Sequence, residues 1–399
     1  MKKALSVLLC LALAFSCCCI AFAGAGAAPA LAFDKNGEFK ILHICDVQDD
    51  YPIASETIQF IHEAIQSTRP DLVVLGGDNT VGDSGCEDPE GQAAKCIEQL
   101  ATVFVEEQTN FTLVFGNHDH QQIAKTNSEE DHDRVNEYLL SQYQKYGGVY
   151  CLANDDKPEL YGVGTQNLVV KASADPDRDA YNLWMLDSGA YEMGDDGEEG
   201  YGCVHADQLD YMMDVNSQLT RRNGGTVPSM AFQHIVVGEI MDELYPVVNT
   251  KMGVLSKFCN NHEYLLIPNL FKIRGFLGEA PCPGAKNYGE LDTLSRIGTV
   301  AVFSGHDHTN AYTANIMGVD VVNTPGCTFH SYGQSHSRGA RLITLHEGST
   351  DYDSRVVTLS ETALKSGSKI LDGATETNRF ECILGVLLNR LFTLFRGRY

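Results

Sequence analysis

Five short apolar segments of this sequence each end abruptly in residues that can bind a metal ion. An apolar run of this length, closed by glycine or polar residues, predicts a buried strand. In an α/β protein the carboxyl ends of parallel strands meet at one edge of a sheet, where ligands bind. The sequence therefore predicts an α/β fold with a polar cluster at one sheet edge. The segments are residues 39–45, followed by Asp46; 71–75, followed by Gly76-Gly77-Asp78-Asn79; 111–115, followed by Gly116-Asn117-His118-Asp119; 228–233, followed by His234; and 300–303, followed by Ser304-Gly305-His306-Asp307-His308.

Apolar residues recur at helical spacing between the first three segments. Ile58, Ile61 and Ile65 share one face of a predicted helix over residues 55–67, and a second helix is predicted over 90–107. This alternation of strand and helix predicts parallel strands joined by right-handed crossovers. The remaining elements we expect are a polar, partly helical region at 120–165, antiparallel strands at 167–171 and 182–186, an acidic glycine-rich loop at 194–200, a helix at 205–219, helix and loop covering one side of the site at 240–294, and strands at 316–322, 340–345 and 355–359 completing a second sheet.

The chain is strongly acidic. Its 399 residues carry a net charge of -24, and 43% of them are hydrophobic, which is ample for a packed core. The acidity argues against a broad surface for nucleic acids or anionic membranes. It is compatible with a protein that collects divalent cations and equally with a surface that is acidic for solubility.

The first 32 residues have the features of a secretory signal peptide. Two lysines precede an apolar run over residues 4–20, and Ala-x-Ala cleavage patterns follow at 21–23 and 30–32. We therefore expect export to the cell envelope or the extracellular medium, with a catalytic domain at 33–365 and a tail at 366–399. An uncleaved membrane anchor and lipid attachment at Cys17, Cys18 or Cys19 are the alternatives.

The predicted tail contains an amphipathic segment at 381–396 that is too short and too interrupted to cross a bilayer. Docking on the domain surface, a peripheral membrane contact and an interaction tail are the three interpretations. The apolar residues at helical spacing are Ile383, Leu384, Leu387, Leu388, Leu391 and Phe395.

Nine cysteines follow the leader, and the sequence contains no Cys-x-x-Cys spacing of the kind that binds structural zinc. An odd number in an exported protein leaves at least one thiol free or paired between chains. Cys86 with Cys96, and Cys259 with Cys282, are the pairs to test first. Cys45 lies in a predicted strand and is interpreted as a small buried hydrophobic residue.

The residues at the strand ends suit two neighbouring cations. A carboxylate between two cations can bridge them, and Asp78 is the candidate for that place. Mixed carboxylate, amide and imidazole ligands favour Mn, Fe or Zn over Ca. In this hypothesis Asp46 and His308 complete one site, and Asn117, His234 and His306 complete the other.

The order of these motifs resembles the calcineurin-like metallophosphoesterase superfamily, and within it the plant and fungal purple-acid-phosphatase-like subgroup. The resemblance covers residues 39–345. It implies a four-layer α/β/β/α sandwich, with two mixed sheets flanked by helices and a dinuclear site at one edge. Two positions depart from the pattern: Gln48 stands where a histidine ligand is usual, which should weaken the first metal site, and Val81 stands where the purple enzymes have a tyrosine ligand.

The same resemblance implies the hydrolysis of a small phosphate ester. Two cations can lower the pKa of a shared water so that hydroxide forms near neutral pH and attacks the phosphorus. His118 would then protonate the leaving group, and Asp119 would orient His118, although Asp119 could instead cap the following helix. Phosphomonoesters are the favoured substrates. The alternatives are nucleotide or lipid-derived diesters, or metal and phosphate binding with little turnover.

Overall fold

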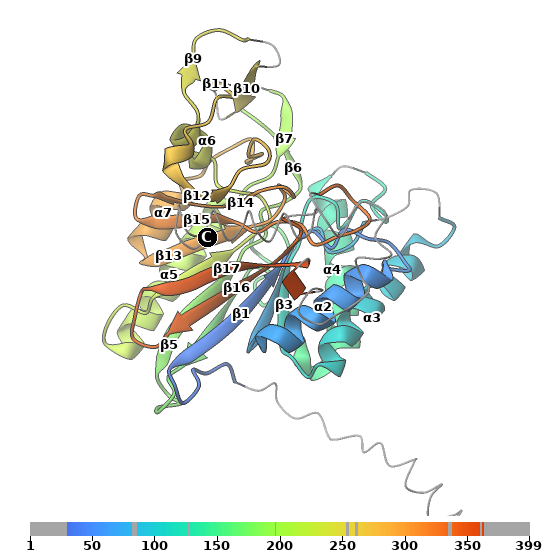
Figure 1. Cartoon of the computed structure of the whole chain (residues 1–399), viewed down its shortest axis with the longest axis vertical. Helices are drawn as coiled ribbons and strands as arrows, with labels where there is room; N and C mark the ends of the chain where they lie inside the picture. Colours follow the sequence, from blue (N-terminus) through green and yellow to red (C-terminus); the bar gives the residue numbers. More distant parts are fainter. Residues whose placement is uncertain are drawn as a thin grey trace, which may run out of the picture.

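Two large β-sheets packed face to face, with helices on both outer surfaces, form the body of the chain in the computed structural model (Figure 1). The structure describes residues 30–362 except 82–85, 127, 196, 253–254, 260–261, 334–336 and 360. The predicted leader, apart from its last residues, and the predicted amphipathic tail lie outside this range. Among the described residues, no helix has the length and apolar character needed to span a membrane.

The first sheet has five strands and contains the first three predicted segments. β1, β2 and β3 are parallel, as the alternating pattern predicts, and β16 pairs antiparallel with β1. The order across the sheet is β17 (Tyr352–Thr358), β16 (Gly339–His346), β1 (Glu38–Ile44), β2 (Leu72–Gly76) and β3 (Phe111–Val114).

The second sheet has seven strands and contains the other two segments. β13, β8 and β5 are parallel neighbours, and β4 pairs antiparallel with β5 as expected. The order is β12 (Ile273–Phe276), β14 (Ala311–Ile316), β15 (Val319–Asn323), β13 (Thr299–Ser304), β8 (Ser229–Phe232), β5 (Asp179–Met185) and β4 (Gln166–Lys171).

Three apolar clusters hold these layers together. One lies between the sheets, where Ile41 and Val74 of the first sheet and Leu183 and Met230 of the second are fully buried. A second lies beneath the helices that cover the first sheet, and a third beneath the helices that cover the second. The predicted four-layer architecture is confirmed. The helices are α2 (Ser55–Thr68), α3 (Pro89–Glu106) and α4 (Glu129–Gly147) on the first sheet, and α5 (Ala206–Asn223), α6 (Glu239–Leu244) and α7 (Glu290–Arg296) on the second, with short 3-10 turns η1 (Gly148–Tyr150) and η3 (Leu270–Lys272).

Local sequence explains where the longer helices begin. The side chain of Asp88 accepts a hydrogen bond from the backbone N–H of Gly91 and precedes Pro89, which suits the first helical position of α3. The Ser128 side chain caps α4 in the same way, and acidic residues fill its first turn.

Two predictions about strands are wrong in detail. Residues 316–322 are not one strand: Met317 and Gly318, both at positive φ, form the two-residue turn between β14 and β15. The predicted strands at 340–345 and 355–359 do not complete a second sheet. They are β16 and β17, and they extend the first sheet beside β1.

Two further regions contain strands that the sequence did not indicate. Inside the region read as helix and loop, β9 (Val247–Val248), β10 (Ser256–Cys259) and β11 (His262–Leu265) form a small separate sheet. The strands β6 (Tyr191–Met193) and β7 (Glu199–Tyr201) form a hairpin around the acidic glycine-rich segment, and only residues 199 and 200 of the predicted loop belong to a strand.

The suggested disulfides are absent from the part of the chain that the structure describes. Cys86, Cys96 and Cys282 are free thiols, so neither proposed pair is formed. Cys96 packs in α3 and donates to the carbonyl of Asp49, while Cys282 lies 3.0 Å from the Lys257 ammonium. Cys45 is fully buried, as predicted.

Candidate metal centre

The loops that follow the five strands are hydrogen-bonded to one another across the two sheets. In the first sheet, the backbone N–H groups of Asp46 and Gln48 donate to the carbonyls of Gly77 and Asp78. In the second sheet, the N–H of Gly305 donates to the carbonyl of His234. The strand ends therefore form a connected frame that fixes the predicted ligands.

Four of the predicted ligands have a left-handed backbone conformation. The φ angles are 53° at Asp46, 39° at Gln48, 49° at Asp78 and 70° at His306. This conformation is uncommon for residues other than glycine, and it persists only where surrounding contacts enforce it. The strain is therefore concentrated at the residues that the sequence selects as ligands.

Asp78, His234 and His306 form one buried ligand group. One ligand atom from each lies within 4.8 Å of the other two. The Nδ1 of His234 donates to the carbonyl of Gly76, so its Nε2 faces the Asp78 carboxylate at 3.2 Å. Either a proton on Nε2 or a metal ion between the two atoms can balance the charge of this carboxylate.

The buried charges of this group influence one another. Burial alone would lower the pKa of His234, but the carboxylates of Asp78 and Asp46 raise it to about 10. Burial opposes ionisation of Asp78 too, yet His234 holds the pKa of that carboxyl well below its usual range. For His306, burial is the main cause and lowers the pKa well below its usual range. A neutral imidazole is the form that can bind a metal.

Asp46 and His308 form the second group, on the side of the first sheet. His308 donates from Nδ1 to the Tyr332 carbonyl, which leaves Nε2 facing an oxygen of Asp46 at 3.5 Å. The same oxygen accepts from the backbone N–H of His306. Burial raises the pKa of Asp46, so the carboxylate is in a site where it needs a cationic partner.

Orphaned polar atoms test whether this site fits metal ions. Four of the predicted ligands have a buried side-chain atom without a hydrogen-bond partner: Asp46 Oδ2, Gln48 Oε1, Asn117 Oδ1 and His234 Nε2. The amide of Asn117 donates to the Tyr191 hydroxyl, which leaves its oxygen as the free acceptor. Other buried side-chain atoms of the described chain also lack a partner, but these four lie on the strand-end loops and are all potential metal ligands. The residues present therefore fit the two cations that the sequence predicts.

Glycines make room for these ligands. A Cβ atom at Gly116 would lie well within 3.0 Å of the Asp78 carboxylate and backbone, and one at Gly77 would meet the His234 ring. Contacts of that length do not occur for real Cβ atoms. The glycines before Asp78 and Asn117 are thus required by close approach at the site.

His118 and Asp119 are both at the site, but their contacts differ from the expected ones. His118 donates from Nδ1 to the side-chain oxygen of Gln121, whose amide in turn donates to the Asn117 carbonyl. The Asp119 carboxylate, by contrast, is bonded to backbone N–H groups of Gly116, Asn79 and Thr80. The residue that orients the His118 ring is therefore Gln121, and Asp119 ties the second and third strand-end loops together.

Three tyrosines at the site were missed from the sequence. The Tyr201 ring stands edge-on to His306, with ring centres 4.3 Å apart, and Tyr332 stacks on His308 at 4.1 Å. Tyr191 contacts Asn117 as described above. They come from the β6–β7 hairpin and a loop after β15, so no strand-end pattern marked them.

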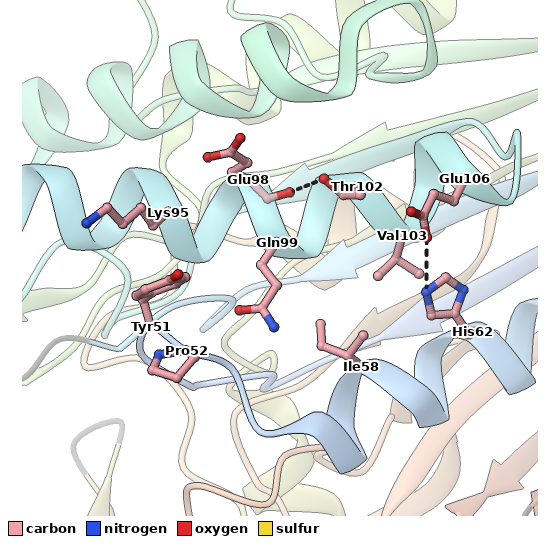
Figure 2. Close-up of a pocket in the computed structure, with 10 residues that line it drawn as sticks. All are labelled: Tyr51, Pro52, Ile58, His62, Lys95, Glu98, Gln99, Thr102, Val103 and Glu106. Atoms are coloured by element: carbon pink, nitrogen blue, oxygen red, sulfur yellow. Dashed lines mark hydrogen bonds and ion pairs between the residues drawn. The ribbon is translucent and has the colours of Figure 1, made fainter. Parts of the chain in front are cut away.

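A separate hollow of about 570 Å³ lies between α2 and α3, on the outer helical layer (Figure 2). Tyr51, Ile58 and Val103 contribute apolar surface, and an ion pair joins His62 to Glu106. None of the predicted ligands lines this hollow, so it is distinct from the metal centre.

Comparison with known proteins identifies the family. A family model described as calcineurin-like phosphoesterase matches residues 39–310, and the chain belongs to this family. The members of this family depend on a pair of metal ions.

The chain is similar to several named proteins. It is 24% identical over 353 residues to "Probable inactive purple acid phosphatase 14" of Arabidopsis thaliana, covering 81% of this chain and 79% of the relative. It is 24% identical over 291 residues to "Phosphatase DCR2" of Saccharomyces cerevisiae, covering 69% of this chain and 45% of that protein. A crystal structure of a dimetal phosphatase from Danio rerio covers 79% of this chain and 98% of its own, at 12% identity and a TM-score of 0.47. That structural likeness is loose, and the family assignment rests on the sequence match.

Proposed function

We propose that this chain is an exported, metal-dependent phosphoesterase that hydrolyses phosphomonoesters. The observation that carries the proposal is the set of four orphaned ligand atoms, which come from loops of both sheets yet belong to residues selected from the sequence. Family membership supports phosphoester hydrolysis. Export, to the cell envelope or beyond, is supported by the leader sequence alone.

The side chains divide the work of the reaction between them. Asp46, Asp78 and His308, with Gln48, would hold one cation; Asp78, Asn117, His234 and His306 would hold the other. When bound, the two cations neutralise phosphoryl oxygens and lower the pKa of water, and Mn, Fe or Zn suits the ligands.

His118 is the candidate proton donor to the departing alcohol. Its Nδ1–H is held by Gln121, so Nε2 is the nitrogen that can present a proton to the leaving oxygen. Since Gln121 also bonds the backbone of Asn117, the acid is fixed relative to a metal ligand.

Aryl phosphates provide the direct test. The purified chain, loaded with Mn, Fe or Zn, should hydrolyse p-nitrophenyl phosphate faster than bis-p-nitrophenyl phosphate. His118→Ala should lower kcat by about 10²–10⁴-fold, whereas His62→Ala, on the outer face of α2, should leave kcat unchanged. Absence of turnover with every metal would defeat the proposal, and faster hydrolysis of the diester would replace the monoesterase assignment.

A second candidate function, metal and phosphate binding with little turnover, is favoured by Gln48. Its amide oxygen is a weaker ligand than imidazole for these metals, and it is buried without a partner. In Gln48→His, a rise in both metal occupancy and kcat would show that a weak first site limits the rate. Tight phosphate binding with negligible rate in both proteins would instead support the binding function.

A further inference from the structure

A small lobe over residues 246–272 exposes a concentration of large apolar side chains. It contains β9, β10, β11 and η3, and its three-stranded sheet projects beyond the two large sheets at the top of Figure 1. Half of the exposed large hydrophobic residues in the described part of the chain lie in this lobe, and Phe271 is 100% exposed. Such a concentration is unusual for a surface that contacts only water. The exposed residues are Val247, Met252, Leu255, Phe258, Ile267, Leu270 and Phe271.

The exposure does not result from a poorly packed lobe. On the inner side, Tyr264 is fully buried, and its hydroxyl donates to Asp242 in α6. The backbone N–H of Asn269 donates to the carbonyl of Leu244, and the Lys257 ammonium donates to the carbonyl of Pro281. The lobe is thus attached to the body through specific contacts, and its apolar residues point outward from a supported base.

The connection from β11 to η3 carries the most exposed of these side chains. Ile267 is 65% exposed, and Leu270 and Phe271 follow after Pro268 and Asn269. The Asn269 side chain accepts from the backbone N–H of Phe271, which fixes the turn that presents Leu270 and Phe271. A protruding apolar turn of this kind suits insertion into a deformable apolar phase.

The charge of the lobe helps to choose among three candidate partners: an anionic bilayer, the amphipathic tail and a second copy of the lobe. Residues 246–272 contain three lysines and one glutamate, in a chain whose net charge is -24. Lys272 forms an ion pair with Glu243, which lies outside the lobe, and Lys251 is exposed. The amphipathic tail is also basic, with four arginines and one glutamate between residues 379 and 399, so charge does not favour the tail as the partner of the lobe. Nor does charge favour a second copy of the lobe, which carries the same excess of lysines.

We propose that this lobe docks on an anionic lipid bilayer, with Ile267, Leu270 and Phe271 inserted at the boundary between headgroups and acyl chains. Apolar insertion combined with lysines near anionic headgroups is the usual combination for interfacial binding. The acidity of the remaining chain does not prevent this, because charges more than about 8 Å from the headgroups are largely screened at physiological salt. The inference is independent of the phosphoesterase proposal, since none of these residues belongs to the metal centre.

Vesicle flotation tests the docking. The purified chain should float with vesicles of phosphatidylglycerol and phosphatidylcholine in equal parts, and less with phosphatidylcholine alone. The double variant Ile267→Ser, Phe271→Ser should lower the partition coefficient at least about tenfold, because each side chain loses its transfer to an apolar phase. Met317→Ser is the matched control, since Met317 is 55% exposed but lies on the turn between β14 and β15. It should bind like the wild type.

Charge and insertion are tested by two further variants. Lys251→Gln should weaken binding to the anionic vesicles about fivefold and leave binding to phosphatidylcholine unchanged. Phe271→Trp should give fluorescence that brominated lipids quench, while the single native tryptophan, Trp184, is fully buried in β5 and should not respond. Quenching of the tryptophan at position 271 reports on the lobe itself, so it is informative even when the leader or the tail also contacts the vesicle.

Three results would overturn the proposal. The first is binding to no vesicle, and the second is equal vesicle binding by wild type and the double variant with no quenching of the new tryptophan. The third is a wild-type dimer, detected by analytical ultracentrifugation, that the double variant converts to monomer without any loss of vesicle binding. That result would assign the lobe to a second copy of the chain.

Discussion

Asp119→Ala distinguishes two roles for Asp119. The sequence predicts that it orients His118, whereas its hydrogen bonds in the structure indicate that it holds two loops together. The buried Asp119 carboxylate accepts hydrogen bonds from the backbone N–H groups of Gly116, Asn79 and Thr80, at 2.8, 2.9 and 2.9 Å. Each buried N–H left without a partner costs about 1–3 kcal/mol. A water molecule that enters the vacated space recovers part of this loss, so we expect the free energy of unfolding to fall by about 3–5 kcal/mol.

The loops that lose these bonds carry Asp78 and Asn117, so the affinity for metal should fall together with the free energy of unfolding. Urea unfolding of the metal-free protein measures the first effect, and titration calorimetry with Mn or Zn measures the second. Asp119→Asn, which keeps one acceptor oxygen but turns an amide toward an N–H group, should show a smaller loss in both.

His118→Ala is the matched comparison, because its side chain contacts Gln121 and none of the loop amides. It should keep near-normal unfolding and metal affinity while losing turnover. The reasoning is refuted if Asp119→Ala behaves like His118→Ala, with unchanged urea midpoint, full metal occupancy and only a lower kcat. That result would restore Asp119 as the residue that orients the acid.

Three further predictions follow from contacts at and near the site. Gly116→Ala should lower metal affinity at least about tenfold, because the added methyl group must displace Asp78, and calorimetry would show it; unchanged affinity would contradict the close approach. Gln121→Ala should lower kcat about tenfold and alter the pH profile set by His118, at full metal occupancy; a simple loss of metal would exclude a positioning role. Burial, and then a neighbouring carboxylate, raise the pKa of Glu290 to about 8 from 4.5. The folded chain therefore keeps a proton that the unfolded chain releases, and stability falls as pH rises through that interval. Glu290→Gln should remove this fall in urea unfolding compared between pH 5 and pH 8, and an unaltered pH dependence would show that the carboxyl is not the cause.

Much of the metal centre could be predicted from the sequence because its residues follow recognisable strands. The apolar runs before Asp46, Asp78 and His306 are long enough to mark buried strands. Parallel pairing places the carboxyl ends of β1 and β2 together, but β13 lies in the other sheet, so packing of the two sheets brings His306 to Asp78. The residues that directly follow each strand were therefore sufficient to select the candidate ligands, and Gln48 is the candidate that departs from the usual histidine. The alternation of strands and helices indicated an α/β fold, and the four-layer class was implied by the resemblance to the metallophosphoesterase superfamily.

Contacts between distant segments decided what the sequence did not. The carboxyl of Asp119 and the amide of Gln121 lie close to His118 in sequence, and only folding determined which of them bonds its ring. Tyr201 reaches His306 from a hairpin about 100 residues away, without a local signal that marks it.

The assignment of strands to sheets was also a tertiary result. Strands β16 and β17 have an apolar pattern that would suit either sheet. In the structure β16 pairs with β1, whereas β15 is paired on both sides, with β13 and β14. The sequence thus determined the strands and the chemistry at their ends, because both are encoded in residues near one another. The partners of those side chains, and the exposure of the lobe that carries Phe271, were decided by tertiary packing, because each depends on groups that the chain brings together only when folded.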